Sequence, residues 1–297
     1  MKIRVSSGTA SYLSLLNSKT LEDPTTAYIL VPGEGCRGAC LYCPQGKGDS
    51  RWLSRVSWPL YELDTFVDKV KTSDLERICL QSPDVKDYEK KIVSVVERLT
   101  CAEKPISVSS PPLSDETLEE IKGPVDYIGV GIDAVTNNIR KETKPSYPPL
   151  VFWEYLGRAV DVFGSENVTA HIIVGMGEDL EKLGAAVNRS FNLGTEVSLF
   201  PLLLEEYEVD LSYYRKAQLL THMIEKGETL VDSLNTVKDN PEDFLKDIEE
   251  GEIFRTRGCP GCNRPYYTSK PGKEHKNYPR SPTIEEIDEI KKELDII

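Results

Sequence analysis

Three cysteines near the amino terminus have the type and spacing needed to bind an iron–sulfur cluster. Cys36, Cys40 and Cys43 form a C-x3-C-x2-C pattern, and Gly35 and Gly38 leave room for the backbone to wrap around a bound group. Three thiolates this close together can bind three irons of a 4Fe–4S cluster and leave the fourth iron open to a ligand. Zinc sites more often combine two C-x2-C pairs or add histidines, and this loop holds no histidine. The pattern therefore predicts a 4Fe–4S cluster with one open iron.

A second cysteine pair lies near the other end of the chain. Cys259 and Cys262 stand in a Cys-Pro-Gly-Cys turn, where two thiols alone are too few to hold a metal group. We predict a second, auxiliary 4Fe–4S cluster here, with a zinc knuckle completed by His275 or a distant cysteine, or a redox dithiol, as the alternatives. Cys79 is a further candidate ligand because it lies in a predicted strand and can point inward. Cys101 precedes the next strand, on the opposite face, and is more easily explained as structural.

The segments between these motifs alternate between strand and helix patterns. Apolar, strand-like runs are predicted at residues 27–32, 77–81, 105–109, 126–131, 168–174 and 196–202. Helices are predicted at residues 87–99, 151–162, 179–191, 211–226 and 284–296. A further helix is predicted to begin after Ser114, its N-cap. At least six strand–helix units therefore lie between residues 27 and 226.

This alternation predicts an α/β protein, a partial or complete (β/α) TIM-type barrel with a C-terminal extension that contains cysteines. No Gly-x-Gly-x-x-Gly motif follows the first strand, which argues against a dinucleotide-binding fold. The cluster loop follows the first strand, at the carboxyl end of the barrel, where active sites of this architecture lie. We divide the chain into a barrel over residues 1–250 and an extension over residues 251–297, where Gly, Pro, Tyr and basic residues replace the periodic pattern.

The composition limits the partners and the compartment. The net charge is −13 and the sequence pI is about 4.9, so lysine and arginine are too few to favour a nucleic-acid substrate. No apolar run approaches the length of a membrane span, and the first ten residues do not resemble an export signal. Five of the seven cysteines lie in two closely spaced groups, which fits metal binding better than disulfides. We expect a cytoplasmic enzyme with no membrane contact.

The cysteine loop, with aromatic Tyr42 just before its last cysteine, resembles the cluster motif of the radical S-adenosylmethionine superfamily. The resemblance covers roughly residues 25–205. It implies that the open iron binds the methionine part of S-adenosylmethionine, and that reduction of the sulfonium releases methionine and a 5′-deoxyadenosyl radical. It also assigns cofactor-binding positions in the loop and at two strand ends. These positions are Tyr42, Gly131, Asp133, His171, Gly175 and Glu178.

Stretches in five places resemble archaeal biotin-synthase-like proteins, among them the subunits of the two-component lipoyl synthase. These stretches are residues 25–28, 43–46, 53–59, 171–178 and 259–266. The resemblance implies sulfur insertion at C6 or C8 of an octanoyl chain carried by a lipoyl-domain or H-type carrier protein. The sulfur would come from the auxiliary cluster, held by Cys259 and Cys262 at the barrel mouth. The implied partners are a second lipoyl synthase subunit and an electron donor.

The same resemblance adds several residues. Ser281, next to Arg280, is similar to the arginine–serine pair that supplies a cluster ligand in lipoyl synthases. Arg55, Arg257 and Arg264 are candidates for binding the cofactor carboxylate, a cluster or the substrate backbone, with surface charge as the alternative for each. Single-chain lipoyl synthases carry their auxiliary cysteines before the cluster loop. No cysteine precedes the loop here, which favours the two-component type.

Three other interpretations stay open. Cys79 resembles an auxiliary ligand of biotin synthase, but Ser107 and Ser109 stand where the matching third-strand cysteine would be. A different radical enzyme, such as a methylase, whose C-terminal cysteine pair binds zinc, is the second alternative. An iron–sulfur carrier protein is the third, and it would not bind S-adenosylmethionine.

Overall fold

One sheet organises the molecule, and the computed structural model describes residues 1–148, 150–204, 207–270 and 272–296. The sheet has eight strands in the order β10-β9-β8-β7-β6-β2-β1-β5. Within the described residues, the six strands from β2 to β10 in this order pair in parallel, as expected for strand–helix units. They are β2 (Thr26–Leu30), β6 (Arg77–Gln81), β7 (Ile106–Ser110), β8 (Tyr127–Asp133), β9 (Val168–Val174) and β10 (Glu196–Pro201). All six predicted strands are confirmed.

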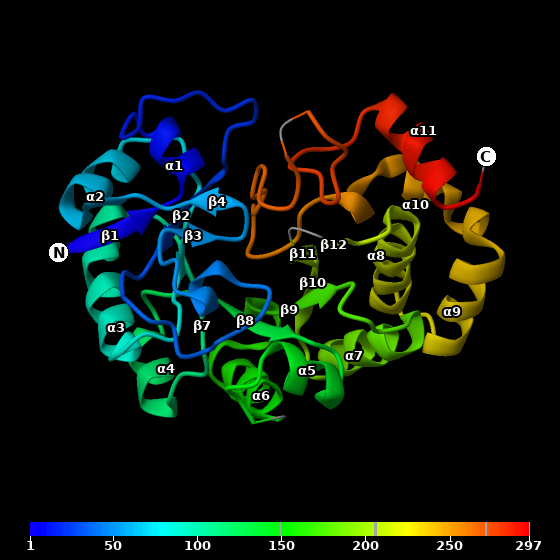
Figure 1. The fold of residues 1–297 in the computed structure, drawn as a ribbon, viewed down its shortest axis with the longest axis horizontal. Helices are drawn as coiled ribbons and strands as arrows, with labels where there is room; N and C mark the ends of the chain where they lie inside the picture. Colours follow the sequence, from blue (N-terminus) through cyan, green and yellow to red (C-terminus); the bar gives the residue numbers. More distant parts are fainter. Residues whose placement is uncertain (149, 205–206, 271, 297) are drawn as a thin grey trace.

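Helices cover the outer face of this curved sheet and follow one another around it in Figure 1. They are α2 (Leu63–Lys71), α3 (Tyr88–Leu99), α4 (Asp115–Ile121), α6 (Val151–Phe163), α7 (Leu180–Asn192) and α8 (Leu211–Glu225). Each buries one apolar stripe; in α3 it is Ile92, Val95, Val96 and Leu99, the residues that gave the predicted spacing. Ser114 accepts a hydrogen bond from the Thr117 amide and caps α4 as predicted.

Two short strands extend the sheet beyond β2, and they make the barrel partial. β1 (Lys2–Val5) pairs antiparallel with β2, and β5 (Leu60–Glu62) pairs antiparallel with β1. Between β1 and β2 lies the short helix α1 (Ser7–Tyr12). An antiparallel edge cannot continue the parallel strand series that closes a full barrel. The predicted α/β architecture is confirmed, and of the two forms expected the chain adopts the partial one.

The chain after β10 returns to the open side of the barrel. The hairpin β11 (Leu203–Leu204) and β12 (Tyr207–Glu208) follows β10, and α9 (Leu230–Asp239) and α10 (Leu245–Glu250) follow α8. An irregular tail then leads to the terminal helix α11 (Ile284–Glu293), close to the predicted 284–296. Among the helices of the described ranges, none is long and apolar enough to span a bilayer.

The tail lies between the two edges of the parallel sheet, coloured orange in Figure 1. On one side the Asn277 side chain donates to the Leu199 carbonyl of β10 at 3.0 Å. On the other side the Asn263 side chain donates to the Asp23 carbonyl at 2.9 Å and accepts from the Thr25 amide at 3.1 Å, just before β2. The tail therefore fills the gap that a partial barrel leaves open. Its residues also share the main apolar core, so the predicted boundary near residue 250 stays a prediction.

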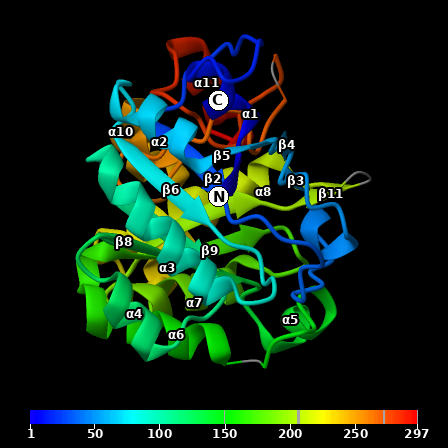
Figure 2. The ribbon, with the colours of Figure 1, turned by 90° about the vertical axis from the view of Figure 1, so that its left-hand side faces the viewer.

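The inner face of the sheet is polar. Tyr28, Cys79, Ser107 and Tyr127 are successive register partners across β2, β6, β7 and β8. Their neighbours along each strand, such as Ile78 on β6, pack outward against the helices. Figure 2 shows that the loops at the carboxyl ends of the strands gather on one side of the molecule, together with the hairpin of β3 (Trp52–Leu53) and β4 (Val56–Ser57).

Candidate active site

The three cysteines of the predicted cluster loop line one hollow at the carboxyl end of the barrel. Cys36, Cys40 and Cys43 border a space of about 230 Å³ together with residues from the ends of β6, β7 and β8 and with His171 from the middle of β9. No three His, Cys, Asp or Glu side chains of the described ranges converge on a point where a single metal ion would sit. A 4Fe–4S cluster needs no such convergence, because each thiolate binds a different iron. The open hollow beside three thiols fits the cluster.

A tight turn after the last cysteine fixes the loop. The 3-10 turn of residues Pro44–Lys47 follows Cys43, and its Gly46 packs against the backbone of Cys40. A Cβ at position 46 would stand 2.7 Å from the Cys40 nitrogen, which leaves no room for any residue but glycine. The buried Gln45 side chain donates to the Ser50 and Trp52 carbonyls at 3.1 and 2.7 Å. The turn therefore holds the loop against the β3–β4 hairpin.

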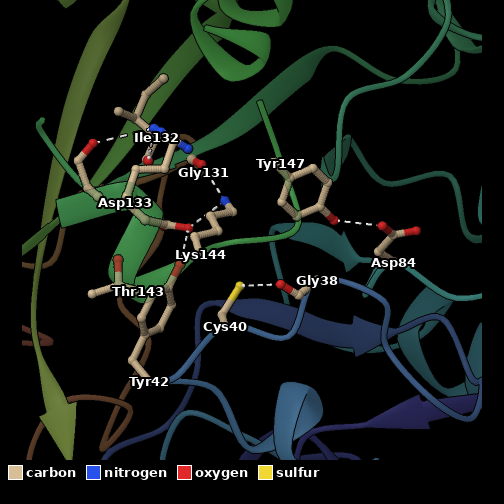
Figure 3. A network of polar contacts seen from close by, with 12 residues as sticks. Gly38, Cys40, Tyr42, Asp84, Gly131, Ile132, Asp133, Thr143, Lys144 and Tyr147 are labelled. Atoms are coloured by element: carbon tan, nitrogen blue, oxygen red, sulfur yellow. Dashed lines mark hydrogen bonds and ion pairs between the residues drawn. The ribbon is translucent and has the colours of Figure 1, made fainter. Parts of the chain in front are cut away.

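The cluster loop is attached to a buried ion pair between Asp133, at the end of β8, and Lys144 (Figure 3). The Tyr42 hydroxyl donates to Asp133 Oδ2 at 2.6 Å, and Lys144 Nζ donates to the same oxygen at 2.7 Å. Lys144 also donates to the Gly131 carbonyl at 2.9 Å. Burial raises the pKa of Asp133, but the charge of Lys144 and the hydrogen bonds from Lys144 and Tyr42 outweigh it, so the pKa is lowered. Asp133 is ionised and holds the loop in place.

A second set of contacts holds the start of the loop. Arg37 pairs with the Asp84 carboxylate, and the Tyr147 hydroxyl donates to the same carboxylate at 2.8 Å (Figure 3). The Leu41 amide donates to the Thr143 carbonyl at 2.9 Å. The segment after β6, the helix α5 (Asn137–Thr143) and the segment after α5 therefore position the start of the loop before any cluster binds.

The chemistry of the thiols also fits a metal group. Burial raises the pKa of Cys40 to about 11, with the charge of Lys144 acting in the opposite sense. Burial likewise raises the pKa of Cys43. Both thiols would be protonated at neutral pH without a cation, whereas coordinated iron replaces the proton.

His171 on β9 faces the same hollow from the barrel interior. Burial lowers its pKa to about 3, and the nearby Arg264 charge adds to the effect, so the imidazole is neutral. A Cβ at Gly129 would stand 2.7 Å from the imidazole, so only glycine at this position of β8 leaves room for the ring. A neutral, fixed imidazole can donate or accept one hydrogen bond to a bound cofactor.

The predicted cofactor residues divide into two groups. Tyr42, Gly131, Asp133 and His171 line the hollow with the cysteines. Gly175 does not, and the Glu178 carboxylate accepts from the Gly175 and Met176 amides at 2.6 and 2.8 Å. Glu178 therefore shapes the turn after β9, and the cofactor contacts expected for Gly175 and Glu178 stay predictions.

The structure brings Cys79, Cys259 and Cys262 together inside the barrel. They pack with one another and with aromatic side chains from β2, β8 and the tail, namely Tyr28, Tyr127 and Tyr267. A hydrogen bond with Cys259 lowers the pKa of Cys79, and the same Cys259 together with burial raises the pKa of Cys262. The three thiols therefore share one buried environment and influence one another's pKa, although they do not converge on the position of a single metal ion.

Their depth in the barrel corrects one expectation. We expected the tail pair at the barrel mouth, but Thr25, just before β2, donates to the Gly261 carbonyl between the two cysteines. A Cβ at Gly261 would stand 2.9 Å from Glu76, just before β6. Both residues mark the amino end of the barrel. The tail enters through the open side rather than over the mouth, which places its cysteines near the amino end of the barrel.

Arg264 lies between the two groups of thiols. Its guanidinium is buried, stacks 5.1 Å from the Phe200 ring centroid, and forms no ion pair with any carboxylate of the described residues. Burial lowers the pKa of Arg264, but the charges of Cys262 and Cys79 raise it by more than burial lowers it, so the guanidinium stays charged. A buried cation without a carboxylate is costly unless a negative charge is nearby, and Cys262 and Cys79 would supply that charge when they are deprotonated.

The other predicted residues lie elsewhere. Ser281 is on the surface and donates to Glu252, away from the three thiols. Arg55 is exposed, and Arg257 pairs with Glu225 at 2.7 Å. Of these candidates, the structure brings Arg264 alone into the interior beside the thiols.

Between the cluster loop and Arg264 lies an apolar slot of about 200 Å³. One end is formed by Tyr42, Cys43, Asp133 and His171 and the other by Arg264 and Tyr267. Apolar side chains form its walls, namely Leu53, Ile173, Phe200, Leu202 and Leu203. Cys43 borders this slot, and Tyr267, which also borders it, packs against Cys79, Cys259 and Cys262, which do not line it themselves.

Sequence reasoning missed Lys144, although it is central to the cluster loop. It lies eleven positions after Asp133 in a segment without periodic pattern, so no local signal links the two residues. Gln81, Asp84 and Tyr147 were missed for the same reason.

Comparison with known proteins identifies the family. The model of the radical SAM superfamily matches residues 30–189, more than half of the chain. The chain belongs to the radical SAM superfamily, and this family implies a 4Fe–4S cluster and S-adenosylmethionine (SAM) as its cofactors. No curated protein matches the sequence.

Two solved structures align with this chain. The crystal structure of methylornithine synthase (PylB) aligns with a TM-score of 0.53 and 14% identity over 65% of this chain and 61% of that one. This chain therefore spans about three fifths of that protein's length. The structure of TYW1 with a lysine-pyruvate adduct bound aligns with a TM-score of 0.46 and 11% identity over 72% of this chain and 80% of that one. At such identities the likeness concerns the fold alone.

Proposed function

We propose that this radical SAM enzyme inserts sulfur at an unactivated carbon, C6 or C8, of a protein-bound octanoyl chain, as a subunit of a two-component lipoyl synthase. The observation that carries the proposal is the apolar slot that runs from the cluster loop to Arg264 and Tyr267, the side chains that lie beside the auxiliary thiols. An alkyl chain in this slot would have the SAM site at one side and the auxiliary thiols at the other. A polar substrate would leave the walls of Leu202, Leu203 and Ile173 in contact with polar groups, which is unfavourable.

The residues have distinct parts in this proposal. Cys36, Cys40 and Cys43 would hold the first cluster, and Tyr42, Asp133 and His171 would border SAM. When bound, this pair of cofactors supplies a carbon-centred radical strong enough to remove hydrogen from an unactivated C–H bond.

The auxiliary cluster that we propose would be held by Cys79, Cys259 and Cys262. Their position behind the slot supports a role as sulfur donor, and Arg264 would balance the negative charge of the donor next to the substrate carbon. The aromatic side chains of Tyr28, Tyr127 and Tyr267 around the three thiols would exclude water from the site.

The proposal includes partners that lie outside this chain. The substrate would be an octanoylated lipoyl-domain or H-type carrier protein, the second sulfur would require the second synthase subunit, and an external donor would reduce the first cluster. The open carboxyl end of the barrel, where the slot and the cysteine hollow lie, supports entry of a carrier-bound arm from that side.

Biotin synthase and a zinc-binding tail are the alternatives. Ser107 is the register partner of Cys79 on β7, where biotin synthase would need a further cysteine, and this argues against the first. The zinc alternative would need the three cysteines and one more ligand around a single ion, and no such set of side chains converges among the described residues.

Metal analysis tests the proposal. After anaerobic reconstitution, wild type should contain about eight irons and a Cys259→Ala/Cys262→Ala variant about four, with an equal fall in acid-labile sulfide. Cys101→Ala is the matched control, because that exposed thiol is remote from both groups, and its iron content should equal wild type. About four irons in wild type with one zinc would overturn the auxiliary cluster and favour the alternative.

Sulfur insertion into the octanoyl chain can be measured directly. With SAM, reductant and an octanoyl-lysyl peptide, mass spectrometry should find peptide in which sulfur has replaced hydrogen. Formation of methionine and deoxyadenosine without any sulfur-containing peptide, in the presence of the second subunit, would reject this substrate.

A further inference from the structure

A separate hollow reaches the auxiliary thiols from the opposite end of the barrel. This amino-end hollow has a volume of about 280 Å³ and is lined by Cys259, Cys262 and the residues around them in the tail. None of its lining residues borders the apolar slot or the cysteine hollow at the carboxyl end. Two of the three auxiliary thiols can therefore be approached without passing the SAM site.

The position of this hollow follows from the elements that border it. Glu196 is the first residue of β10 and Glu225 the last residue of α8, and both ends lie at the amino end of a parallel barrel. Gly258 and Gly261 each precede one of the two cysteines, so no side chain from these two positions fills the hollow beside the thiols. Cys259 and Cys262 are 6% and 8% exposed, so they are close to the surface but not on it.

The chemistry of the hollow differs from that of the slot. Its walls carry Glu196, Glu225, Arg255, Thr256 and Arg257, where the slot carries leucine, isoleucine and phenylalanine. Arg257 pairs with Glu225 at 2.7 Å and Arg255 with Glu252 at 2.8 Å, so the charges are balanced and partly exposed. A wet, polar entrance suits an ionic or thiolate-bound species rather than an alkyl substrate.

We propose that the amino-end hollow is the entrance through which a preassembled iron–sulfur cluster, carried on thiolate ligands, is delivered to Cys79, Cys259 and Cys262. This inference rests on the proposed function, in which the auxiliary cluster gives up sulfur and must be replaced. Delivery exchanges ligands: each cysteine thiol loses a proton and binds an iron, and each carrier thiolate leaves and takes up a proton. No electrons are transferred, so no oxidant or reductant is required.

The division of entrances has a functional consequence. SAM and an acyl chain occupy the carboxyl end during catalysis, so a replacement arriving there would have to wait for both to leave. Entry at the amino end makes replacement independent of their occupancy. The auxiliary site therefore exchanges its cluster while SAM and the acyl chain are bound at the carboxyl end.

The test compares cluster exchange with the entrance open and obstructed. Holoenzyme with saturating SAM is treated with a ferrous chelator until the auxiliary iron is lost, then supplied with a synthetic 4Fe–4S cluster bearing mercaptoethanol ligands. Thr256→Trp places a large side chain in the hollow at a half-buried position, and Arg255→Trp is a second such variant. Lys273→Trp, on an exposed part of the same tail, is the control.

We expect both entrance variants to slow iron loss and restoration several-fold, while Lys273→Trp matches wild type. The first turnover, which uses the resident cluster, should be unchanged in all four proteins. Exchange at the wild-type rate in both entrance variants, or protection of the auxiliary iron by SAM as strong as that of the first cluster, would overturn the proposal. If wild type and the Cys259→Ala/Cys262→Ala variant hold equal iron, the proposed function fails first, which distinguishes the two failures.

Discussion

Removal of the Lys144 ammonium group tests how the cluster loop is held. Its Nζ donates to Asp133 Oδ2 at 2.7 Å and to the Gly131 carbonyl at 2.9 Å, and it lies 3.5 Å from the Phe152 ring centroid. The two charged side chains are 6% and 16% exposed. Lys144→Met preserves most of the apolar stem and leaves the Asp133 carboxylate buried with one remaining donor, Tyr42.

Breaking a buried ion pair by removing one partner costs about 3–5 kcal/mol, because an uncompensated charge is left behind. Lys144→Met should therefore lower the free energy of unfolding by about 3 kcal/mol or more. In the double variant Lys144→Met/Asp133→Asn no charge is left, so the loss should be smaller than the sum of the two single losses by at least about 1 kcal/mol.

Urea unfolding followed by circular dichroism under anaerobic conditions measures both quantities. Because the pKa of Asp133 is lowered in the folded state, the pair contributes fully above about pH 4, the unfolded value, and its contribution is lost as the pH falls through the folded value. The deficit of Lys144→Met should shrink below pH 4 accordingly. A single-variant loss below about 1 kcal/mol, or strictly additive losses, would refute the reasoning.

Three further predictions concern single positions. Gly46→Ala should remove about four irons, because its Cβ would stand 2.7 Å from the Cys40 nitrogen, whereas Gly157→Ala, with nothing within 4 Å, should not. Because the pKa of His171 is about 3 folded and about 6.5 unfolded, stability should fall by up to about 1.4 kcal/mol per pH unit from pH 6 toward 4, and His171→Gln should abolish this slope. Arg264→Met should lower auxiliary iron alone, from a total of about eight toward four, with Arg264→Lys intermediate; a loss from the first cluster instead would contradict the charge argument.

Local sequence patterns were sufficient for the main elements of the fold. Each of the six parallel strands is an apolar run between turn residues, and the helices that cover them repeat apolar residues at helical spacing. Both signals depend on neighbours a few positions away. The short elements β1, β5 and α1 lack such signals and were missed, as was α2, so the antiparallel edge that makes the barrel partial was not foreseen.

The cluster loop could also be predicted from the sequence, because its three thiols lie within eight positions and need no tertiary contact to come together. The contacts among Tyr42, Asp133 and Lys144 could not be predicted from the sequence, since these residues come from a loop, a strand end and the segment after α5.

The sequence by itself therefore determined the strand–helix series, the cluster loop and the family. Only the tertiary structure decided that Cys79 meets Cys259 and Cys262, and that Arg264 lies between the two thiol groups. The physical reason is that the barrel leaves one side open, and the tail fills it because its polar groups find partners there, such as the Leu199 carbonyl and the backbone before β2. A contact made across some 180 positions depends on the whole sheet being formed first, and no local spacing encodes it.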